Sequence, residues 1–505
     1  KVNEKFRSVI SHSSDDKVKV VYSWHGPRGP LWNTELPNVL TFASSAEGVN
    51  PMMESRNFWN DDIWQKQFSK AKDKYEMYAV QTIEADDRRP FIYPFSLTWR
   101  VEFEKYFINT NGLLEFSHMP DWLLHLVKTS NGYILIDHSV EAFMSDRELS
   151  AMFSYFHEHH QIPMYKIIYL TGTINASKVY EEWHTKNNIP NDREHRMHVI
   201  PYASSREIFH MFYNNPGLGL LSYTPVTEPK YIPSYDENEV PEKLFLSWNR
   251  RYRKHRVLLV LALEQLDLVD KSLISFQKID GENGHDTFMN QVTNIQTDDR
   301  DFVGRLNLYG NTPFEFDDDV VIPRFANKLP LVIDGETDIN KMCEDWGHTA
   351  QYYKRTLVSL VTETNYNTKE CTLTEKSFKP MYNKHPFMIV GVPGTIRGLQ
   401  DLGFKTFSEF WDESYDDESQ PGLRMEKILN NVKLIASWTP DQVLDFKRRV
   451  KPILEHNYNM FSEPGSVAVV NNIYNHITDN FEPVWTNGCH PGKCYFEGAR
   501  RNDQP

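Results

Sequence analysis

The chain has 505 residues, of which 40% are hydrophobic and 13% are aromatic, and its formal net charge is −14. This composition excludes a mostly disordered chain, and the length exceeds the ~100–200 residues of one domain, so two sizeable domains are expected. No apolar run approaches the ~18 residues of a membrane helix. The acidic balance disfavours broad electrostatic attraction to duplex DNA.

The cysteines and the first residues indicate a reduced, cytoplasmic setting. Four cysteines are too few and too scattered for a disulfide framework. The charge-rich start has no apolar stretch of the kind found in a retained signal peptide. Cys489 and Cys494 flank His490 but lack a second ligand pair, so a zinc site there is disfavoured.

The first predicted strand covers residues 18–24 and leads into a loop rich in glycine and proline. A loop at the carboxyl end of a strand is where α/β folds bind ligands. The loop has no G-x-G-x-x-G pattern, so the dinucleotide fingerprint is absent. His25 in this loop is a candidate general base or phosphate contact, and a structural hydrogen bond is the favoured alternative.

The next elements alternate between strands and helices, which is typical of an α/β fold with a parallel sheet covered by helices. The predicted strands are 133–136, 166–170 and 198–201, and the predicted helices are 147–157 and 176–186.

Acidic side chains follow the strand at 133–136. Asp137 and Glu141 are expected at the carboxyl edge of the sheet, where a carboxylate can serve as a general base. An equally weighted alternative is that Asp137 caps the next segment and Glu141 lies on the surface. The histidines within 157–160 end a helix without metal-ligand spacing, so we expect a solvated helix end and assign no metal ligand.

Residues 214–242 are rich in proline, glycine and acidic residues, which indicates a domain edge near residue 235. We therefore expect an N-terminal domain over 1–235, a C-terminal domain over 236–464, and a final segment, 465–505, that returns to the first domain.

The second domain opens with a predicted strand at 243–247, a basic cluster, and an apolar helix at 257–266. A basic cluster between a strand and a helix start is a natural anion site. Arg251 and Arg256 are expected to hold a pyrophosphate through forked hydrogen bonds. The alternatives are a nucleic-acid patch or an ordinary solvated surface.

Three further patterns precede the last part of the chain. The acidic run at 317–319 contains an Asp-x-Asp, but three consecutive acids are common on solvated turns, so a structural role is favoured. Residues 330–334 predict a strand, and residues 352–361 predict a helix.

The stretch 363–403 reads as a polar loop, a helix at 377–384, a buried strand at 386–390 and a glycine turn. Thr374 is expected to cap the helix, so that Glu375 and Lys376 stand beside unpaired backbone N–H groups. A helix start with a lysine is a natural seat for phosphate. The alternative is a plain capping motif with a solvated ion pair.

This stretch resembles the donor-binding motif of the α-1,3-fucosyltransferases. The resemblance is closest to glycosyltransferase-like proteins of large phages and viruses, and it is carried by residues 374–380, 385–387 and 403–407. It covers the C-terminal half of the chain and is faint in the N-terminal half. It implies the GT-B architecture, in which two Rossmann-like domains face a central cleft, and a cytoplasmic enzyme, in the host cytoplasm if the chain is viral.

The resemblance also implies an inverting, metal-independent transfer of a sugar from a nucleotide-diphosphate donor, with a GDP-sugar favoured, to an acceptor hydroxyl. It requires no cofactor besides this donor. The acceptor is a glycan, a protein or a modified base. In this interpretation Lys376 and Arg251 hold the diphosphate and Glu375 grips a hydroxyl of the ribose or sugar.

The full set of candidate site residues combines this resemblance with the residue patterns described above. The donor-binding candidates are Asn249, Arg250, Arg251, Arg256, Glu363, Asn365, Thr374, Glu375 and Lys376, and the candidates for the general base are Asp137, Glu141 and His25. The polar run before Thr374 is longer than the family pattern, which leaves the sugar open. The alternatives are a phage glycosyltransferase acting on modified DNA bases, or a non-catalytic viral protein on a transferase fold that binds nucleic acid or has a structural role.

Overall fold

The computed structural model describes residues 17–22, 73–79, 90–96, 121–139, 145–203, 234–249, 253–276, 318–333, 350–462 and 466–480. The chain divides into two compact units, which we treat one at a time. Unit 1 comprises Lys1–Glu207 and Pro464–Pro505, and unit 2 comprises Ile208–Glu463. The boundary expected near residue 235 falls inside unit 2.

Unit 1 contains a parallel sheet of six strands in the order β2-β1-β3-β4-β5-β6. The strands are β1 (Val18–Tyr22), β2 (Tyr75–Ala79), β3 (Phe91–Ser96), β4 (Gly132–His138), β5 (Ile167–Thr171) and β6 (His198–Pro201). Both faces of β4 and β5 are buried, as expected for central strands of a parallel sheet.

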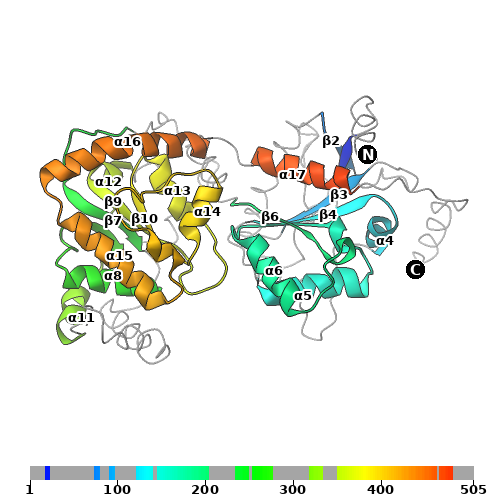
Figure 1. The fold of residues 1–505 in the computed structure, drawn as a ribbon, viewed down its shortest axis with the longest axis horizontal. Coiled ribbons are helices and arrows are strands. Elements are labelled where there is room, and N and C mark those ends of the chain that lie inside the picture. The colour runs from blue at the N-terminus through cyan, green and yellow to red at the C-terminus, as the bar shows by residue number, and fades with distance from the viewer. Residues whose placement is uncertain are drawn as a thin grey trace, which may run out of the picture. The chain divides into compact units, whose positions relative to one another are not determined.

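Helices cover both faces of this sheet (Figure 1). The helical segments are α4 (Asp121–Thr129), α5 (Asp146–Phe153), the π-helix Ser154–His159, the 3₁₀ turns Met164–Lys166 and Arg193–His195, α6 (Ala176–Lys186) and α17 (Ser466–Asp479). Helices α4, α5 and α6 share one core with the side chains of Ile134 and Ile136. Helix α17 packs on the other face, against Tyr133 and Leu135. The alternation along β4 therefore separates two cores.

Unit 2 contains a second parallel sheet, in the order β10-β9-β7-β8. Its strands are β7 (Lys243–Asn249), β8 (Leu273–Phe276), β9 (Thr356–Thr362) and β10 (Phe387–Val390). The chain runs from β7 to β8 on one side and then returns to β9 and β10 on the other. The strand order therefore reverses between β7 and β9, and such a switch point is where open α/β sheets bind ligands, outside the carboxyl ends of the strands.

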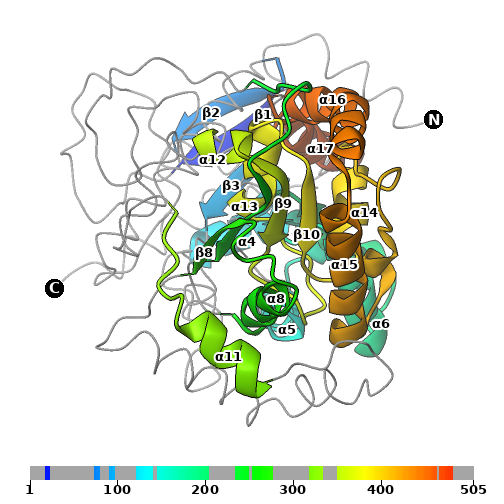
Figure 2. The same cartoon turned by 90° about the vertical axis from the view of Figure 1, so that its left-hand side faces the viewer.

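The helices of unit 2 lie on opposite faces of its sheet (Figures 1 and 2). They are α8 (Lys254–Gln265), α11 (Asp318–Ala326), α12 (Ala350–Lys354), α13 (Glu375–Tyr382), α14 (Thr395–Asp401), the 3₁₀ turn Ser414–Asp417, α15 (Pro421–Ala436) and α16 (Pro440–Ser462). Helix α8 covers one face, whereas α12, α13 and α16 cover the other. Both units are thus Rossmann-like parallel α/β layers, and none of the helices among the described residues is long and apolar enough to cross a membrane.

Two predicted elements of unit 2 are wrong. The helix expected over 352–361 is instead the short helix α12 followed by strand β9. All seven residues of β9 are buried, and a continuous apolar run does not distinguish a buried helix from a two-faced strand. In the strand expected at 330–334, the described residues form a single antiparallel bridge between Leu331 and Phe276. The predicted order of helix and strand at α13 and β10 is confirmed.

Candidate functional site

The candidate site lies at the carboxyl ends of β7 and β9, where the strand order of unit 2 reverses. Asn249 ends β7 and is 1% exposed. Its side-chain NH₂ donates to Ser247 Oγ at 2.8 Å, and its Oδ1 accepts from the Thr362 hydroxyl at 2.7 Å. Asn249, predicted to bind the donor, therefore joins the ends of the two strands.

Glu363 follows β9 directly, and its buried carboxylate organises the start of α13. It accepts hydrogen bonds from the Thr374 N–H at 3.1 Å, the Thr374 hydroxyl at 2.7 Å and the Thr364 N–H at 3.2 Å. The Ser377 hydroxyl donates to it as well. Thr374 in turn caps the helix by accepting from the Lys376 N–H. The negative charge that this helix start favours is thus already supplied by Glu363.

Glu375 and Lys376 stand on the first turn of α13 and are partly open to solvent. Their side chains are 25% and 24% exposed, and Lys376 Nζ lies 2.9 Å from Glu375 Oε1 and 3.2 Å from Thr374 Oγ1. Burial alone would raise the pKa of the Glu375 carboxyl, but Lys376 and Lys379 outweigh it and lower this pKa to about 2. The pair is therefore ionised at neutral pH and presents an ammonium at the sheet edge.

Two basic residues at the start of α8 hold the main chain at the end of β9. His255 Nε2 lies 2.8 Å from the Glu363 carbonyl oxygen, and the Arg256 guanidinium donates to the Thr362 carbonyl at 3.1 Å. Both side chains are buried. Burial, helped by the charge of Arg256, lowers the pKa of His255 to about 3, so the ring is neutral and donates through Nε2–H. Arg256, predicted to hold a pyrophosphate, is directed to main-chain carbonyls.

The helix starts that follow β7, β9 and β10 differ in their capping. Helix α13 is capped by Thr374, and Asp416 accepts from the first turn of α14 through Ile396 N–H at 2.9 Å and Arg397 N–H at 3.1 Å. Helix α8 has no side-chain cap, and its N-cap residue Arg253 is exposed. Of these starts in the described part of unit 2, α8 is the one best disposed to receive an external anion.

The polar loop between β9 and α13 is fixed by contacts that the sequence did not indicate. Tyr366 stacks on the His255 ring with centroids 5.1 Å apart, and its hydroxyl donates to the Pro421 carbonyl at 2.8 Å. Arg424 lies over the Tyr366 ring at 4.3 Å and donates to the carbonyls of Tyr366 and Glu418. These contacts connect residues remote in sequence, so no local motif could identify them.

The remaining predicted residues are distributed over both units. Asn365 is a partly exposed residue of the polar loop in unit 2. In unit 1, Asp137 is fully buried and accepts from the N–H and hydroxyl of Ser139 at 3.1 and 2.6 Å. Arg250, Arg251, His25, Glu141, Asp317 and the pair Cys489 and Cys494 lie outside the described residues.

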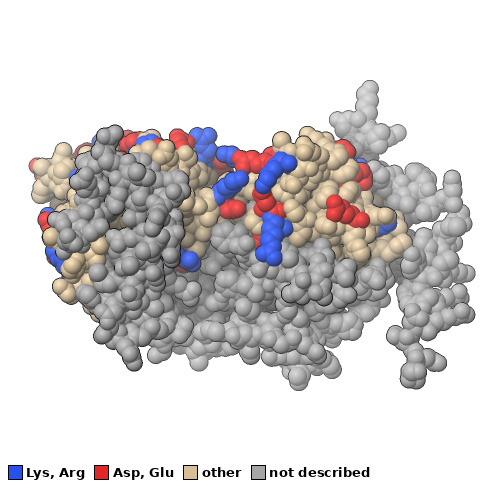
Figure 3. Space-filling model, turned by 90° about the horizontal axis from the view of Figure 1, so that it is seen from below, with Lys and Arg blue, Asp and Glu red and all other residues tan. Residues whose placement is uncertain are grey.

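The described residues contain no cluster of acidic, histidine or cysteine side chains able to hold a metal ion. The histidines within 157–160 are part of this described set and belong to no such cluster. On the face drawn in Figure 3, the acidic and basic side chains of the described residues are interspersed rather than gathered by sign. The described residues drawn there thus form no single-sign basic stripe of the kind typical of a nucleic-acid surface.

The chain was also compared with known proteins. No protein-family model, no curated protein and no solved structure matches it.

Proposed function

We propose that unit 2 binds the nucleotide diphosphate of a sugar donor and that the chain is a glycosyltransferase of the GT-B class. One observation carries the proposal. At the switch point of the parallel sheet, the uncapped start of α8, with Arg253 as its N-cap residue, contacts Glu363 through His255. Glu363 in turn binds Thr374, and Thr374 binds the ammonium of Lys376. Helix starts and fixed cations are the groups that hold diphosphates. The resemblance of residues 374–380 to fucosyltransferase donor motifs supports the same function.

The proposed chemistry needs charge stabilisation and one base. The acceptor oxygen bonds to the anomeric carbon of the sugar as the bond from this carbon to the diphosphate oxygen breaks, and the leaving diphosphate keeps the electron pair. Lys376 and the α8 amides stabilise that developing charge, and Glu375 accepts a hydroxyl of the ribose or sugar. A base must take the acceptor proton. Of the three candidates predicted from the sequence, Asp137 is fully buried against Ser139, and Glu141 and His25 lie outside the described residues.

The assignment within unit 2 differs from the sequence-based one in two respects. Asn249 and Arg256 are buried and engaged with Thr362 and the main chain, so we assign them to the support of the site. Arg253 takes the place of Arg256 because it is exposed beside the uncapped helix start. Lys376 and Glu375 keep the roles that the motif indicated.

A nucleotide titration tests the proposal. GDP and UDP, each with EDTA present, should raise the melting temperature of the full chain, because a ligand at ~100 times its Kd stabilises by ~2.7 kcal/mol. Lys376→Ala and Arg253→Ala should each weaken binding about tenfold or more, since each removes a charge-assisted hydrogen bond. Lys405→Ala is the matched control, because Lys405 is an exposed lysine of the same unit outside the site.

The contrary outcome is also informative. If no nucleotide diphosphate shifts the melting temperature but the chain binds DNA in a salt-dependent way, the proposal fails and the nucleic-acid-binding alternative gains.

A further inference from the structure

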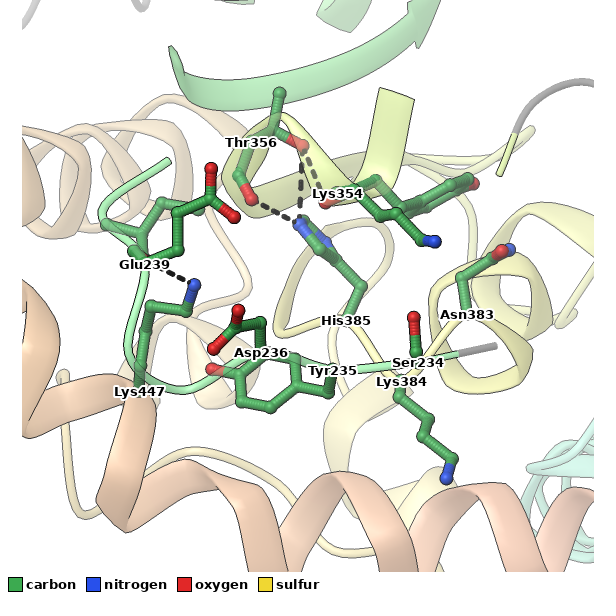
Figure 4. A pocket seen from close by; sticks show the side chains of 12 residues that line it. Ser234, Tyr235, Asp236, Glu239, Lys354, Thr356, Asn383, Lys384, His385 and Lys447 are labelled. Atoms are coloured by element: carbon green, nitrogen blue, oxygen red, sulfur yellow. Dashed lines mark hydrogen bonds between the residues drawn. The ribbon is translucent and has the colours of Figure 1, made fainter. Parts of the chain in front are cut away.

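A pocket of unit 2 lies at the opposite edge of the same sheet, at the amino ends of its strands (Figure 4). Thr356 at the start of β9 lines it, as do the turn after α13 and Lys447 of α16. The segment before β7 contributes Ser234, Tyr235, Asp236 and Glu239. Its empty volume is about 520 Å³, a figure that includes the open solvent at its mouth. Nothing in the proposed glycosyl transfer uses this pocket.

His385 forms part of the rigid wall of this pocket. Its Nε2 lies 2.9 Å from the Thr356 carbonyl oxygen, so this nitrogen carries the proton, and its Nδ1 accepts from the Ser359 hydroxyl at 2.9 Å. Burial lowers the pKa of His385 to about 4. Both ring nitrogens of the neutral ring are thus engaged with β9, and His385 positions the wall without acting as a ligand for an anion.

Two buried polar atoms in the wall have no hydrogen-bond partner among the described residues. They are the hydroxyl of Tyr235 and Oδ1 of Asn383, and the Asn383 residue is only 5% exposed. Burying such a group without a partner is costly, so a polar occupant that supplies both a donor and an acceptor is favoured. Figure 4 shows the two residues lining the same pocket, with Lys447 on the far side from Asn383.

The charges around the pocket are of both signs, because Lys354, Lys384 and Lys447 line it together with Asp236 and Glu239. The Lys447 ammonium is buried, donates to the Glu239 carbonyl and is attracted by Asp236 and Glu239. Lys384 is committed to both carboxylate oxygens of Glu455 at 2.9 and 3.1 Å. A multiply charged anion would therefore meet two carboxylates, whereas a neutral ligand meets donors and acceptors of both kinds.

We propose that this pocket binds a neutral polyhydroxylated ligand, a monosaccharide or the terminal sugar of a glycan. Sugar hydroxyls both donate and accept, so one ring can satisfy Tyr235, Asn383 and the remaining N–H groups of Lys447 together. The site is distinct from the proposed donor site and does not depend on it.

Saturation-transfer NMR on the full chain tests the proposal, with glucose, galactose, mannose and N-acetylglucosamine as probes and inorganic phosphate as the charged comparison. Maltose in the same titration distinguishes a free monosaccharide from the end of a chain. Tyr235→Phe should weaken sugar binding about threefold to tenfold, and Lys447→Met should weaken it similarly. Tyr235→Phe should not lower the melting temperature, because the lost hydroxyl has no partner.

Tyr180→Phe in unit 1 is the matched control. Its hydroxyl accepts from the Met197 N–H at 3.0 Å, so this variant should lose stability and keep sugar binding. Binding that persists in Lys376→Ala and with GDP present supports the pocket, even if GDP itself does not bind. The proposal is overturned if no sugar binds, if phosphate alone binds, if both pocket variants bind sugar normally, or if Lys376→Ala abolishes sugar binding.

Discussion

At the scale of single residues, Glu363 determines how the candidate site is built. The sequence made it a donor-binding candidate, whereas in the structure its carboxylate accepts hydrogen bonds from Thr364, Thr374 and Ser377. This one side chain therefore ties the end of β9 to the start of α13, and through its main-chain carbonyl it also receives His255 of α8. The position of Lys376 depends on it.

Replacing this carboxylate by an amide tests that dependence. Glu363→Gln keeps the shape but exchanges an acceptor oxygen for an NH₂ group that faces the hydroxyl and amide donors. We expect a loss of about 2 kcal/mol in the free energy of unfolding, because hydrogen bonds to buried charged groups contribute ~1.5–3 kcal/mol. Urea denaturation measures it, and Glu370→Gln, on a partly exposed residue of the same loop, should change stability by less than ~0.5 kcal/mol. Equal midpoints for both variants would contradict the role assigned to Glu363.

The residues around Glu363 show which contacts of the candidate site could be predicted from the sequence. The local motif Thr374-Glu375-Lys376 placed the cap and the ion pair correctly, because these contacts span one or two residues. It could not reveal that Arg256 and Asn249 are buried, since their partners lie 106 and 113 residues away. The pocket around Tyr235 and Asn383 was not predicted, because its lining residues are also far apart in the sequence.

At the scale of elements, hydrophobic runs were a good predictor of burial. They were a poorer predictor of whether the buried segment is a helix or a strand. The segment 352–361 was assigned to a helix, but most of it belongs to β9, which is hydrogen-bonded between β7 and β10. Thr356, Val358, Val361 and Thr362 are β-branched and favour a strand, and that signal outweighs the apolar run. The segment 387–390, bounded by a proline and a glycine, was short enough to read correctly.

Helix α17 gives an element-scale prediction. Ile473 is fully buried against the unit 1 sheet, with Tyr133 and Leu135 in the same core. Ile473→Ala should lower the stability of unit 1 by ~2–5 kcal/mol, because it removes buried methyl groups and leaves a cavity. Hydrogen exchange should show β4 and β5 losing protection while β9 in unit 2 is unchanged. Asn475→Ala, on the exposed side of the same helix, is the control. Equal loss of protection in β9 would show that α17 does not act on unit 1 alone.

At the scale of the whole molecule, the division into two units follows cores rather than linker composition. The proline-rich and acidic stretch 214–242 suggested a boundary near 235, yet residues 234–240 belong to unit 2. Lys447 of α16 donates to the Glu239 carbonyl, and Lys451 pairs with Glu237 at 2.7 Å. Composition reports where a chain is polar, but these contacts decide which unit a polar segment joins.

Both units share a dependence on pH that is set by buried histidines. Burial lowers the pKa of His138 and His255 to about 3 and that of His385 and His476 to about 4. The first and last of these belong to unit 1, and the other two belong to unit 2. Because the unfolded chain binds their protons near pH 6.5, the stability is fully present above that pH and is lost as the pH falls below it.

We therefore expect the free energy of unfolding of each unit to fall below pH 6.5 by up to ~1.4 kcal/mol per pH unit for each of its buried histidines. Burial also raises the pKa of Glu413 and Asp416, which acts on stability with the opposite sign. The measurement brackets the ordinary pKa of histidine, from about pH 5.5 to 7.5. Urea denaturation across this range gives the slope of the free energy of unfolding against pH. In unit 2, His385→Gln should reduce this slope by the contribution of about one proton, ~1.4 kcal/mol per pH unit. NMR of the native chain is the independent check, because ring signals of these histidines that titrate near pH 6.5 would show that they are not held neutral by the fold.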